Sequence, residues 1–426
     1  MNNQPPNLFA NAGYRYFLGF NSISSIGGGF HFIASYWLLY SRTESSSAVA
    51  WLIIAFWLPS VLVMPFGGVL LDRWNRRRFL VGLSVYFALL DGVLAAIMMF
   101  GHFVPNYLYV YAGLTSFAWP MVFMANQAYL KGHLSRDELL QSNSYNTAMF
   151  QGGYLAGAGI AGWLYPQIGA AGCFVINGLS MLVATVGWLT ITRWFPDAPQ
   201  SASGSADRAS FLDDYRVGLR YIRNDVPLFL FALFAIVPRL ASQVLNVVVI
   251  AFAMDVLRCG AFGFGLLDMS YGVGAMLCAF AFPALTNRWG LSPLLPTTLL
   301  VITAGVMITV SFTESIGAAM FAIGIFGAGV NLVGVISNTV LQRDVPLDVI
   351  GRITSVVQFC QLATIPPAVW LIGQYADREA GAVLHVDIIR DSFVVSGVVF
   401  LAIGIVSMFV TRPFIARRGG IRAVKA

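Results

Sequence analysis

Residues 68–78 read GVLLDRWNRRR, a glycine and an aspartate that lead into a run of arginines. The stretch lies between two long apolar segments of the chain. A shortened copy, ALTNRWG at residues 284–290, lies between two later apolar segments. Because the two copies are separated by about half of the 426 residues, the sequence predicts two related halves.

The composition excludes an ordinary soluble domain. Hydrophobic residues make up 58% of the chain and charged residues only 10%, against about 25% charged residues in soluble domains. The four cysteines show neither a CxxC pair nor metal-ligand spacing, so we expect no disulfide, no metal site and no cofactor. The N-terminus lacks the basic start and cleavage site of a secretory signal. From the composition, we expect most of the chain to face lipid.

Twelve segments are long and apolar enough to span a bilayer as helices, which takes about 20 residues each. Six lie on each side of a polar stretch that begins as a Pro- and Ser-rich linker and continues as an amphipathic helix. We predict an all-α membrane protein with two pseudo-symmetric six-helix bundles, residues 1–192 and 228–426, joined by a cytoplasmic linker, residues 193–227. The predicted spans are residues 14–40, 49–71, 79–101, 105–130, 142–166, 170–192, 228–254, 262–286, 293–313, 315–341, 353–375 and 392–411.

The basic residues indicate the orientation. If both termini are cytoplasmic, most lysines and arginines fall in cytoplasmic loops, as the positive-inside rule requires. The outer side then receives only Arg42, Arg258, Arg378 and Arg390. The net charge of +6 therefore comes from loops between spans, and we expect no nucleic-acid partner.

Several motifs resemble one family. The stretch at residues 68–78 resembles the G-x-x-x-D-R-x-G-R-R/K signature between helices two and three of the major facilitator superfamily. FVINGLS at 174–180, VGLRYIR at 217–223 and GRITS at 351–355 narrow the resemblance to its bacterial exporter branch, which contains the enterobactin exporter and macrolide efflux (transmembrane secretion effector) proteins. No Walker A motif is present, so we do not expect ATP hydrolysis to drive transport.

The resemblance implies a secondary transporter of the bacterial inner membrane that works by alternating access. Its partners would be a small-molecule substrate, protons and membrane lipid, and we expect a monomer. The motif residues would act as gating charges that pair in one state and separate in the other. These gating candidates are Gly68, Asp72, Arg73, Arg76, Arg77, Asn287 and Arg288.

Arg239 is the most informative charge, because it falls about 16 Å into its predicted span and a mid-membrane charge is costly. Gln243 and Asn246 share its helix face. In the family's fold, spans one, four, seven and ten line the central cavity, which implies a polar substrate site. Contact with substrate, a structural ion pair and local gating all remain open for Arg239. The other substrate-binding candidates are His31, Trp119, Phe123, Gln127, Asn331 and Asn338.

Asp91, Asp268 and His31 are the candidates for proton coupling. Burial favours the protonated form of a carboxyl group, and histidine exchanges protons near neutral pH. Relatives often carry an acidic residue in span one, where this chain has Gly28. Asp91 can instead pair with a neighbouring helix, and His31 can simply be hydrogen-bonded.

A glycine-rich stretch at residues 153–162 resembles the antiporter motif of exporters, but Ala158 stands where proline is usual. A packing face of small residues is an equally good interpretation.

The leading functional hypothesis is proton-coupled export of a small, polar, anionic molecule, with a carboxylate or catecholate siderophore as the best single candidate. The alternatives are macrolide or multidrug efflux, a metabolite importer and a lysophospholipid flippase. An enzyme would need a nucleophile–base pair or paired carboxylates, and the sequence shows neither.

Overall fold

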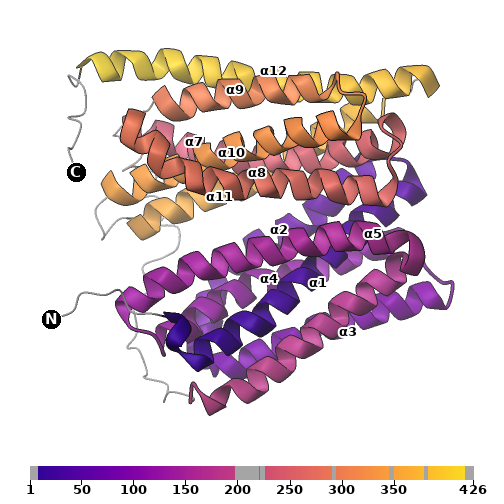
Figure 1. Cartoon of the computed structure of the whole chain (residues 1–426), viewed down its shortest axis with the longest axis vertical. Coiled ribbons are helices and arrows are strands. Elements are labelled where there is room, and N and C mark those ends of the chain that lie inside the picture. Colours follow the sequence, from indigo (N-terminus) through magenta and orange to yellow (C-terminus); the bar gives the residue numbers. More distant parts are fainter. Residues whose placement is uncertain are drawn as a thin grey trace. The chain divides into compact units, whose positions relative to one another are not determined.

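The computed structural model describes residues 8–196, 220, 226–289, 294–344, 350–378 and 382–417. Figure 1 shows that the chain folds into long helices, and these residues contain no β-strand. The predicted amphipathic helix at 211–222 lies outside the described residues apart from Arg220. The α-helices are α1 (Ala12–Thr43), α2 (Ser46–Arg73), α3 (Arg76–Met99), α4 (Asn106–Lys131), α5 (Arg136–Thr190), α7 (Val226–Ala251), α8 (Gly260–Trp289), α9 (Leu294–Val310), α10 (Ile316–Asp344), α11 (Ile350–Ala376) and α12 (Ala382–Arg417).

These helices match the predicted spans, and the all-α prediction is confirmed. One helix, α5, covers two predicted spans. Within it Gly169 has φ 66° and ψ −176°, a backbone conformation that a helix does not contain. Glycine adopts a positive φ without steric cost, which explains why the chain changes direction there. The described residues thus form eleven helices, and the exact number of twelve spans stays a prediction.

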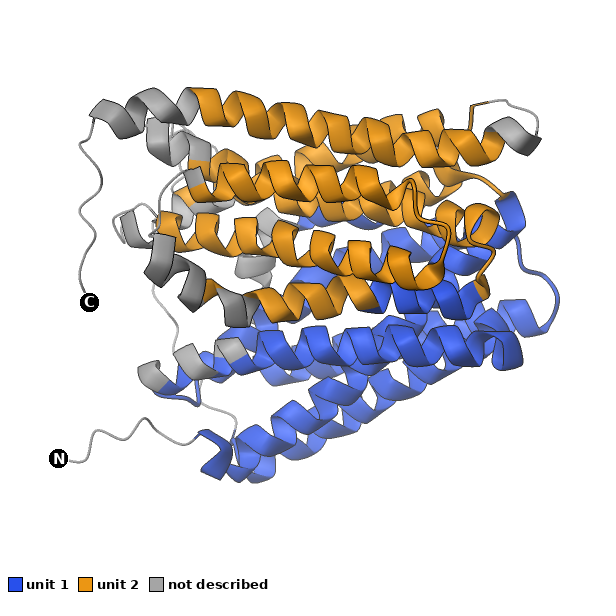
Figure 2. Cartoon of the chain, turned by 45° about the horizontal axis from the view of Figure 1, so that its top comes forward, with its two compact units in different colours: residues 1–43, 55–207, 261–269 blue, residues 44–54, 208–260, 270–426 orange. Residues whose placement is uncertain are grey.

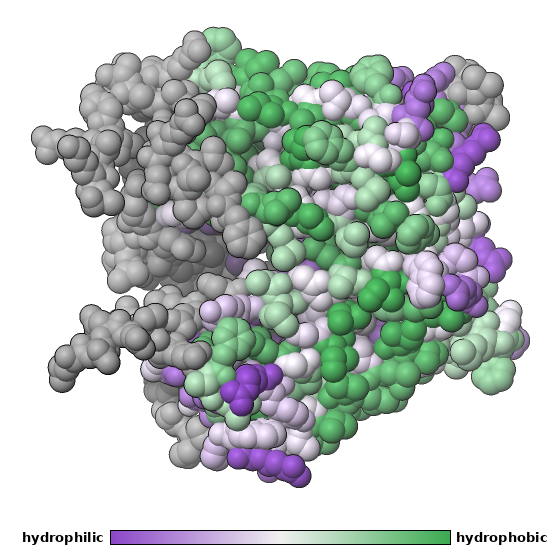
Figure 3. All heavy atoms as spheres, in the orientation of Figure 1, coloured by the Kyte–Doolittle hydropathy of each residue, from purple (hydrophilic) through white to green (hydrophobic). Residues whose placement is uncertain are grey.

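The helices make this a multi-pass membrane protein. In the described part of the chain, nine are long and apolar enough to cross a bilayer. Figure 3 shows hydrophobic residues over much of the visible face, with hydrophilic residues gathered toward the helix ends. α1 is not among the nine, because it carries polar residues along its length, including Asn21, Ser22, Ser24, Ser25 and His31.

The contacts divide the chain into two compact units (Figure 2). Unit 1 comprises residues 1–43, 55–207 and 261–269, and unit 2 comprises 44–54, 208–260 and 270–426. Each unit thus contains one short segment from the other half of the sequence. The predicted bundle limits at residues 192 and 228 stay a prediction.

Glycines bring the helices of unit 1 into backbone contact. A Cβ atom on Gly157 of α5 would overlap the carbonyl oxygen of Ile26 on α1. A Cβ on Gly29 of α1 would likewise overlap the backbone of Tyr154. Gly162 faces α8, where its Cβ would lie 2.8 Å from the Ala261 oxygen. The glycine-rich stretch at 153–162 therefore forms a packing face, as one of its two interpretations expected.

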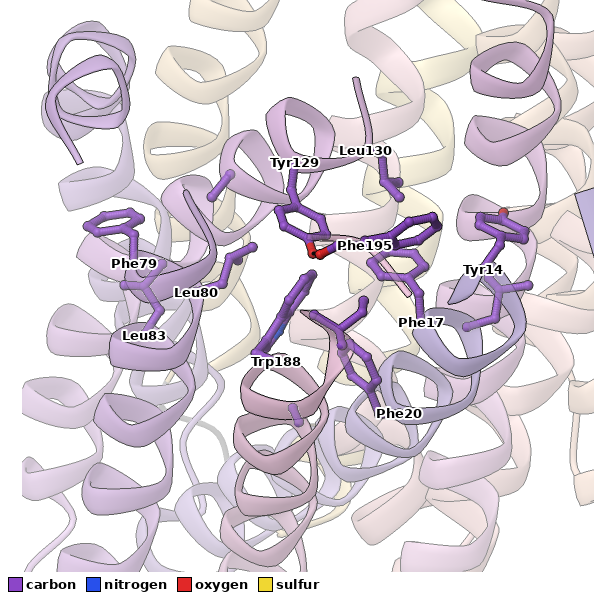
Figure 4. Packing of buried hydrophobic residues seen from close by; sticks show 14 of the residues in the cluster. Tyr14, Phe17, Phe20, Phe79, Leu80, Leu83, Tyr129, Leu130, Trp188 and Phe195 are labelled. Carbon is purple, nitrogen blue, oxygen red and sulfur yellow. Dashed lines mark hydrogen bonds between the residues drawn. The ribbon is translucent and has the colours of Figure 1, made fainter. Parts of the chain in front are cut away.

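A cluster of aromatic side chains joins α1, α3, α4 and the end of α5 in unit 1 (Figure 4). Trp188 lies at its centre, with its ring 5.0 Å from the Phe20 ring and 5.2 Å from the Tyr129 ring. The Tyr129 hydroxyl donates a hydrogen bond to the Phe195 carbonyl oxygen over 3.3 Å. This cluster holds the ends of four helices together.

In unit 2, α7 packs against α10 and α11, and α9 packs against α10 and α12. A Cβ on Gly274 of α8 would overlap the Gly324 carbonyl of α10. Gln361 of α11 donates a hydrogen bond over 2.7 Å to the Ala235 carbonyl oxygen of α7. These contacts place polar residues of α7, α8 and α10 close together.

Candidate functional site

α7 carries a polar stripe on an otherwise apolar helix. Arg239, Gln243 and Asn246 lie on one face, because they are separated by about one helical turn each. Asn246 Nδ2 donates to Gln243 Oε1 over 3.3 Å. Gln243 is buried, and the Arg239 side chain keeps exposed surface although it lies deep among protein atoms. The exposed cation thus stands beside a preorganised pair of amides.

A second helix contributes Asn331. Its Nδ2 atom donates to the Tyr271 hydroxyl over 3.2 Å and to the Gly327 carbonyl oxygen over 2.9 Å. Tyr271, on α8, also interacts electrostatically with Arg239. Tyr271 therefore connects the polar stripe of α7 with Asn331 of α10. Asn338 is exposed two turns further along α10.

Sequence reasoning did not single out Tyr271. Glycines of α10 allow α8 to bring Tyr271 close, because a Cβ on Gly327 would overlap the Tyr271 backbone oxygen. Gly334 faces α7, where its Cβ would lie 3.4 Å from Pro238 Cγ. The glycines of α10 were a usable signal, since small residues mark close approaches between membrane helices.

The α4 candidates lie in unit 1. Phe123, which is 66% exposed, and Gln127 line one open hollow of about 430 Å³ together with Lys131. The Trp119 ring instead lies 5.7 Å from the Phe150 ring of α5. A larger hollow of about 630 Å³ between α1 and α5 is lined mainly by apolar side chains and contains none of the predicted site residues.

Asp91 of α3 is fully buried and hydrogen-bonded on both oxygens. Its Oδ1 accepts from the Tyr111 hydroxyl over 2.5 Å, and its Oδ2 accepts from Asn177 Nδ2 over 2.8 Å. His31 Nδ1 lies 3.0 Å from the same Tyr111 hydroxyl. Two of the three proton-coupling candidates thus belong to one hydrogen-bonded chain.

Asp268, the third candidate, lies in the segment of α8 that belongs to unit 1. It interacts electrostatically with Tyr36 of α1 and Tyr154 of α5. Its Oδ2 atom is buried and has no hydrogen-bond partner among the described residues. None of these contacts joins Asp268 to the hydrogen-bonded chain around Asp91.

The arginines that follow α2 donate hydrogen bonds to the ends of two other helices. Arg76 Nη1 donates over 3.0 Å to the Ala128 carbonyl of α4, and Arg77 Nη1 donates over 3.3 Å to the Trp188 carbonyl of α5. Cations at helix C-termini are favourable, because the last carbonyls carry partial negative charge. Gly68, Asp72, Arg73, Asn287 and Arg288 lie in the last turns of α2 and α8, and their side chains are outside the described residues.

A many-helix membrane protein with polar residues inside its helices has an architecture that transporters share. The sequence profile of the Major Facilitator Superfamily matches residues 16–366. The chain belongs to this superfamily.

Relatives and solved structures agree with this assignment. The multidrug efflux pump Tap of Mycolicibacterium fortuitum is 25% identical over 404 residues, which cover 91% of this chain and 92% of Tap. A variant of the nucleoside transporter NupG has a TM-score of 0.70 at 12% identity and covers 94% of this chain and 100% of its own. An inward-facing bacterial homologue of the iron transporter ferroportin has a TM-score of 0.67 at 17% identity. The match covers 92% of this chain and 98% of the homologue. At these identities the two structures show the fold alone.

Proposed function

We propose that the protein is a secondary active exporter of a small, polar, anionic molecule, which binds at the α7 stripe and leaves in exchange for protons. The observation that carries this proposal is the exposed side chain of Arg239 in the middle of an apolar helix. Placing a cation in the middle of a membrane helix is unfavourable, and even the lowest scales give a cost of about 2.5–3.5 kcal/mol. Because of this cost, a charged residue inside an apolar helix is a candidate for a functional site.

The chemistry of the stripe suits a carboxylate or catecholate. A guanidinium group binds planar oxygen anions through paired hydrogen bonds. Gln243, Asn246, Asn331 and the Tyr271 hydroxyl add neutral groups that can bind further oxygens of the same molecule. A siderophore of these classes is the best single substrate candidate, and Asn338 would extend the site along α10.

Efflux of drugs is the second candidate. It is supported by the resemblance to Tap, whose name describes a multidrug efflux pump. It is also supported by the exposed ring of Phe123 beside Gln127, because flat apolar surfaces suit drug-sized molecules. His31 and Trp119 would contribute to either substrate only through neighbouring side chains.

Proton coupling rests on the three buried or partly buried candidates, Asp91, Asp268 and His31. A carboxyl group in such surroundings can hold a proton in one conformation and release it in another. The gating residues around Arg76 and Arg77 would then separate during alternating access. We place the protein in the bacterial cytoplasmic membrane as a monomer among lipids, with both termini in the cytoplasm.

Deletion of the gene in its native host tests the proposal. We expect less siderophore in the medium under iron limitation, with accumulation inside the cells. Unchanged secretion together with new sensitivity to macrolides or dyes would replace the leading candidate by drug efflux. Loss of uptake of an external metabolite would contradict export altogether.

A further inference from the structure

The hydrogen bonds around Asp91 form a chain, and chemistry restricts which group in it donates and which accepts. Tyr111 is buried, and its hydroxyl contacts Asp91 Oδ1 on one side and His31 Nδ1 on the other. A hydroxyl group carries one hydrogen, so it can donate to only one of these two neighbours at a time. The other neighbour must then donate to the hydroxyl oxygen, because two facing acceptors would leave buried lone pairs unsatisfied.

With His31 as a neutral imidazole, two arrangements satisfy all of these groups. In the first, Asp91 is ionised, Tyr111 donates to it, and His31 carries its hydrogen on Nδ1 and donates to Tyr111. In the second, Asp91 is protonated and donates to Tyr111, Tyr111 donates to His31 Nδ1, and His31 carries its hydrogen on Nε2. The two arrangements differ by one proton.

We propose that His31 and Tyr111 form a proton path to Asp91, in which the direction of the Tyr111 hydroxyl links the charge of Asp91 to the tautomer of His31. A proton that binds His31 Nε2 releases the Nδ1 hydrogen to the Tyr111 oxygen, and the Tyr111 hydrogen passes to Asp91 Oδ1. One proton enters at the histidine and one is gained by the carboxylate.

Burial gives this path its direction. Asp91 has no exposed surface, whereas part of the His31 side chain is accessible, so we place the entry of protons at the histidine. The Phe174 ring packs in an edge-on arrangement against both rings, 5.9 Å from the His31 ring and 5.5 Å from the Tyr111 ring. The path therefore runs through side chains.

The surroundings of Asp91 contain few competing groups. α4 contributes Tyr111, α1 contributes His31 through Tyr111, and α5 contributes the neutral amide of Asn177. Cys173, a titratable group further back on α5, interacts with Tyr165. Among the described residues that contact Asp91, none is a lysine or an arginine. Its charge is therefore set first by burial, then by these two hydrogen bonds and by the proton itself.

Nitrogen-15 NMR of histidine-labelled protein in lipid tests the path without a substrate. The sequence has four histidines, so a His31→Gln variant identifies the His31 signals. In the wild type we expect the ring hydrogen of His31 on Nδ1 at alkaline pH and on Nε2 after Asp91 binds its proton. In Tyr111→Phe this switch should disappear, while Tyr107→Phe, an exposed tyrosine of the same helix, should retain it.

A second measurement follows the carboxyl group itself. The C=O stretch of protonated Asp91, identified by its absence in Asp91→Asn, should appear at the pH at which the His31 tautomer changes. A His31 tautomer that is constant with pH, or a switch that persists in Tyr111→Phe, would overturn the proposal. The path rests on the proposed proton coupling and adds the route that the proton takes. These spectra test the route itself, so their outcome does not depend on which substrate is exported.

Discussion

The carboxylate of Asp377, in the turn after α11, accepts a hydrogen bond over 2.6 Å from the backbone N–H of Ser46 at the start of α2. It also accepts from the N–H of Ser47 over 2.8 Å and from the Ser45 hydroxyl over 2.5 Å. The first N–H groups of a helix have no partner within it, and they carry partial positive charge. Asp377 therefore caps a helix that begins 331 residues earlier in the chain.

Replacing Asp377 by alanine should lower the free energy of unfolding. The change leaves two helix N–H groups without their acceptor, which costs about 1–3 kcal/mol for a buried group. Thermal unfolding in detergent measures this loss. Asp387→Ala, an exposed aspartate of α12, is the control and should leave the midpoint almost unchanged. Equal midpoints for both variants would contradict the capping role.

Gly157→Ala should destabilise unit 1, because the added Cβ would overlap the Ile26 backbone. A backbone atom cannot move aside as a flexible side chain does, so α1 and α5 would have to separate. Gly82→Ala, on α3, is the matched control because its Cβ would meet nothing within 4 Å. There alanine should stabilise the helix by about 0.5–1 kcal/mol. Opposite signs in thermal unfolding are the expected result.

Trp188→Ala should cost about 3–5 kcal/mol of unfolding free energy, as expected for removal of a large buried aromatic side chain. Its ring lies at the centre of the aromatic cluster in Figure 4 and is 2% exposed. Trp163→Ala removes a ring that is 57% exposed on α5 and should cost much less. Similar losses in the two variants would show that the cluster does not stabilise the helix ends.

Tyr271→Phe should weaken substrate binding while preserving the fold. The variant keeps the ring but loses the hydroxyl that accepts from Asn331 and interacts with Arg239. We expect a higher KM for export with little change in the maximal rate. Tyr375→Phe, in the last turn of α11, serves as the control. An unchanged KM would remove Tyr271 from the site.

The sequence predicted the helices well, because apolar runs of about 20 residues and the loops between them are local features. The arginine-rich stretch after α2 was also visible locally, although its hydrogen bonds to Ala128 and Trp188 were not. The break at Gly169 was predicted as a separation between two spans.

Contacts between distant helices were harder to predict. Tyr271, Tyr111 and Asp377 gain their roles from partners that lie far away in the chain. His31 was predicted as a candidate for substrate binding and for proton coupling, and its hydrogen-bond partner Tyr111 was not predicted. Helical periodicity gives the face of a residue, whereas its partner depends on which helix packs there.

The most direct test of the account is export by a deletion strain that carries either Arg239→Gln or Arg258→Gln. Both variants remove one arginine charge, but Arg258 is exposed beyond the end of α7. We predict that the medium contains almost no siderophore with Arg239→Gln and normal amounts with Arg258→Gln, at equal levels of membrane protein. Normal secretion by the Arg239→Gln strain would contradict the proposed binding of an anionic substrate at α7.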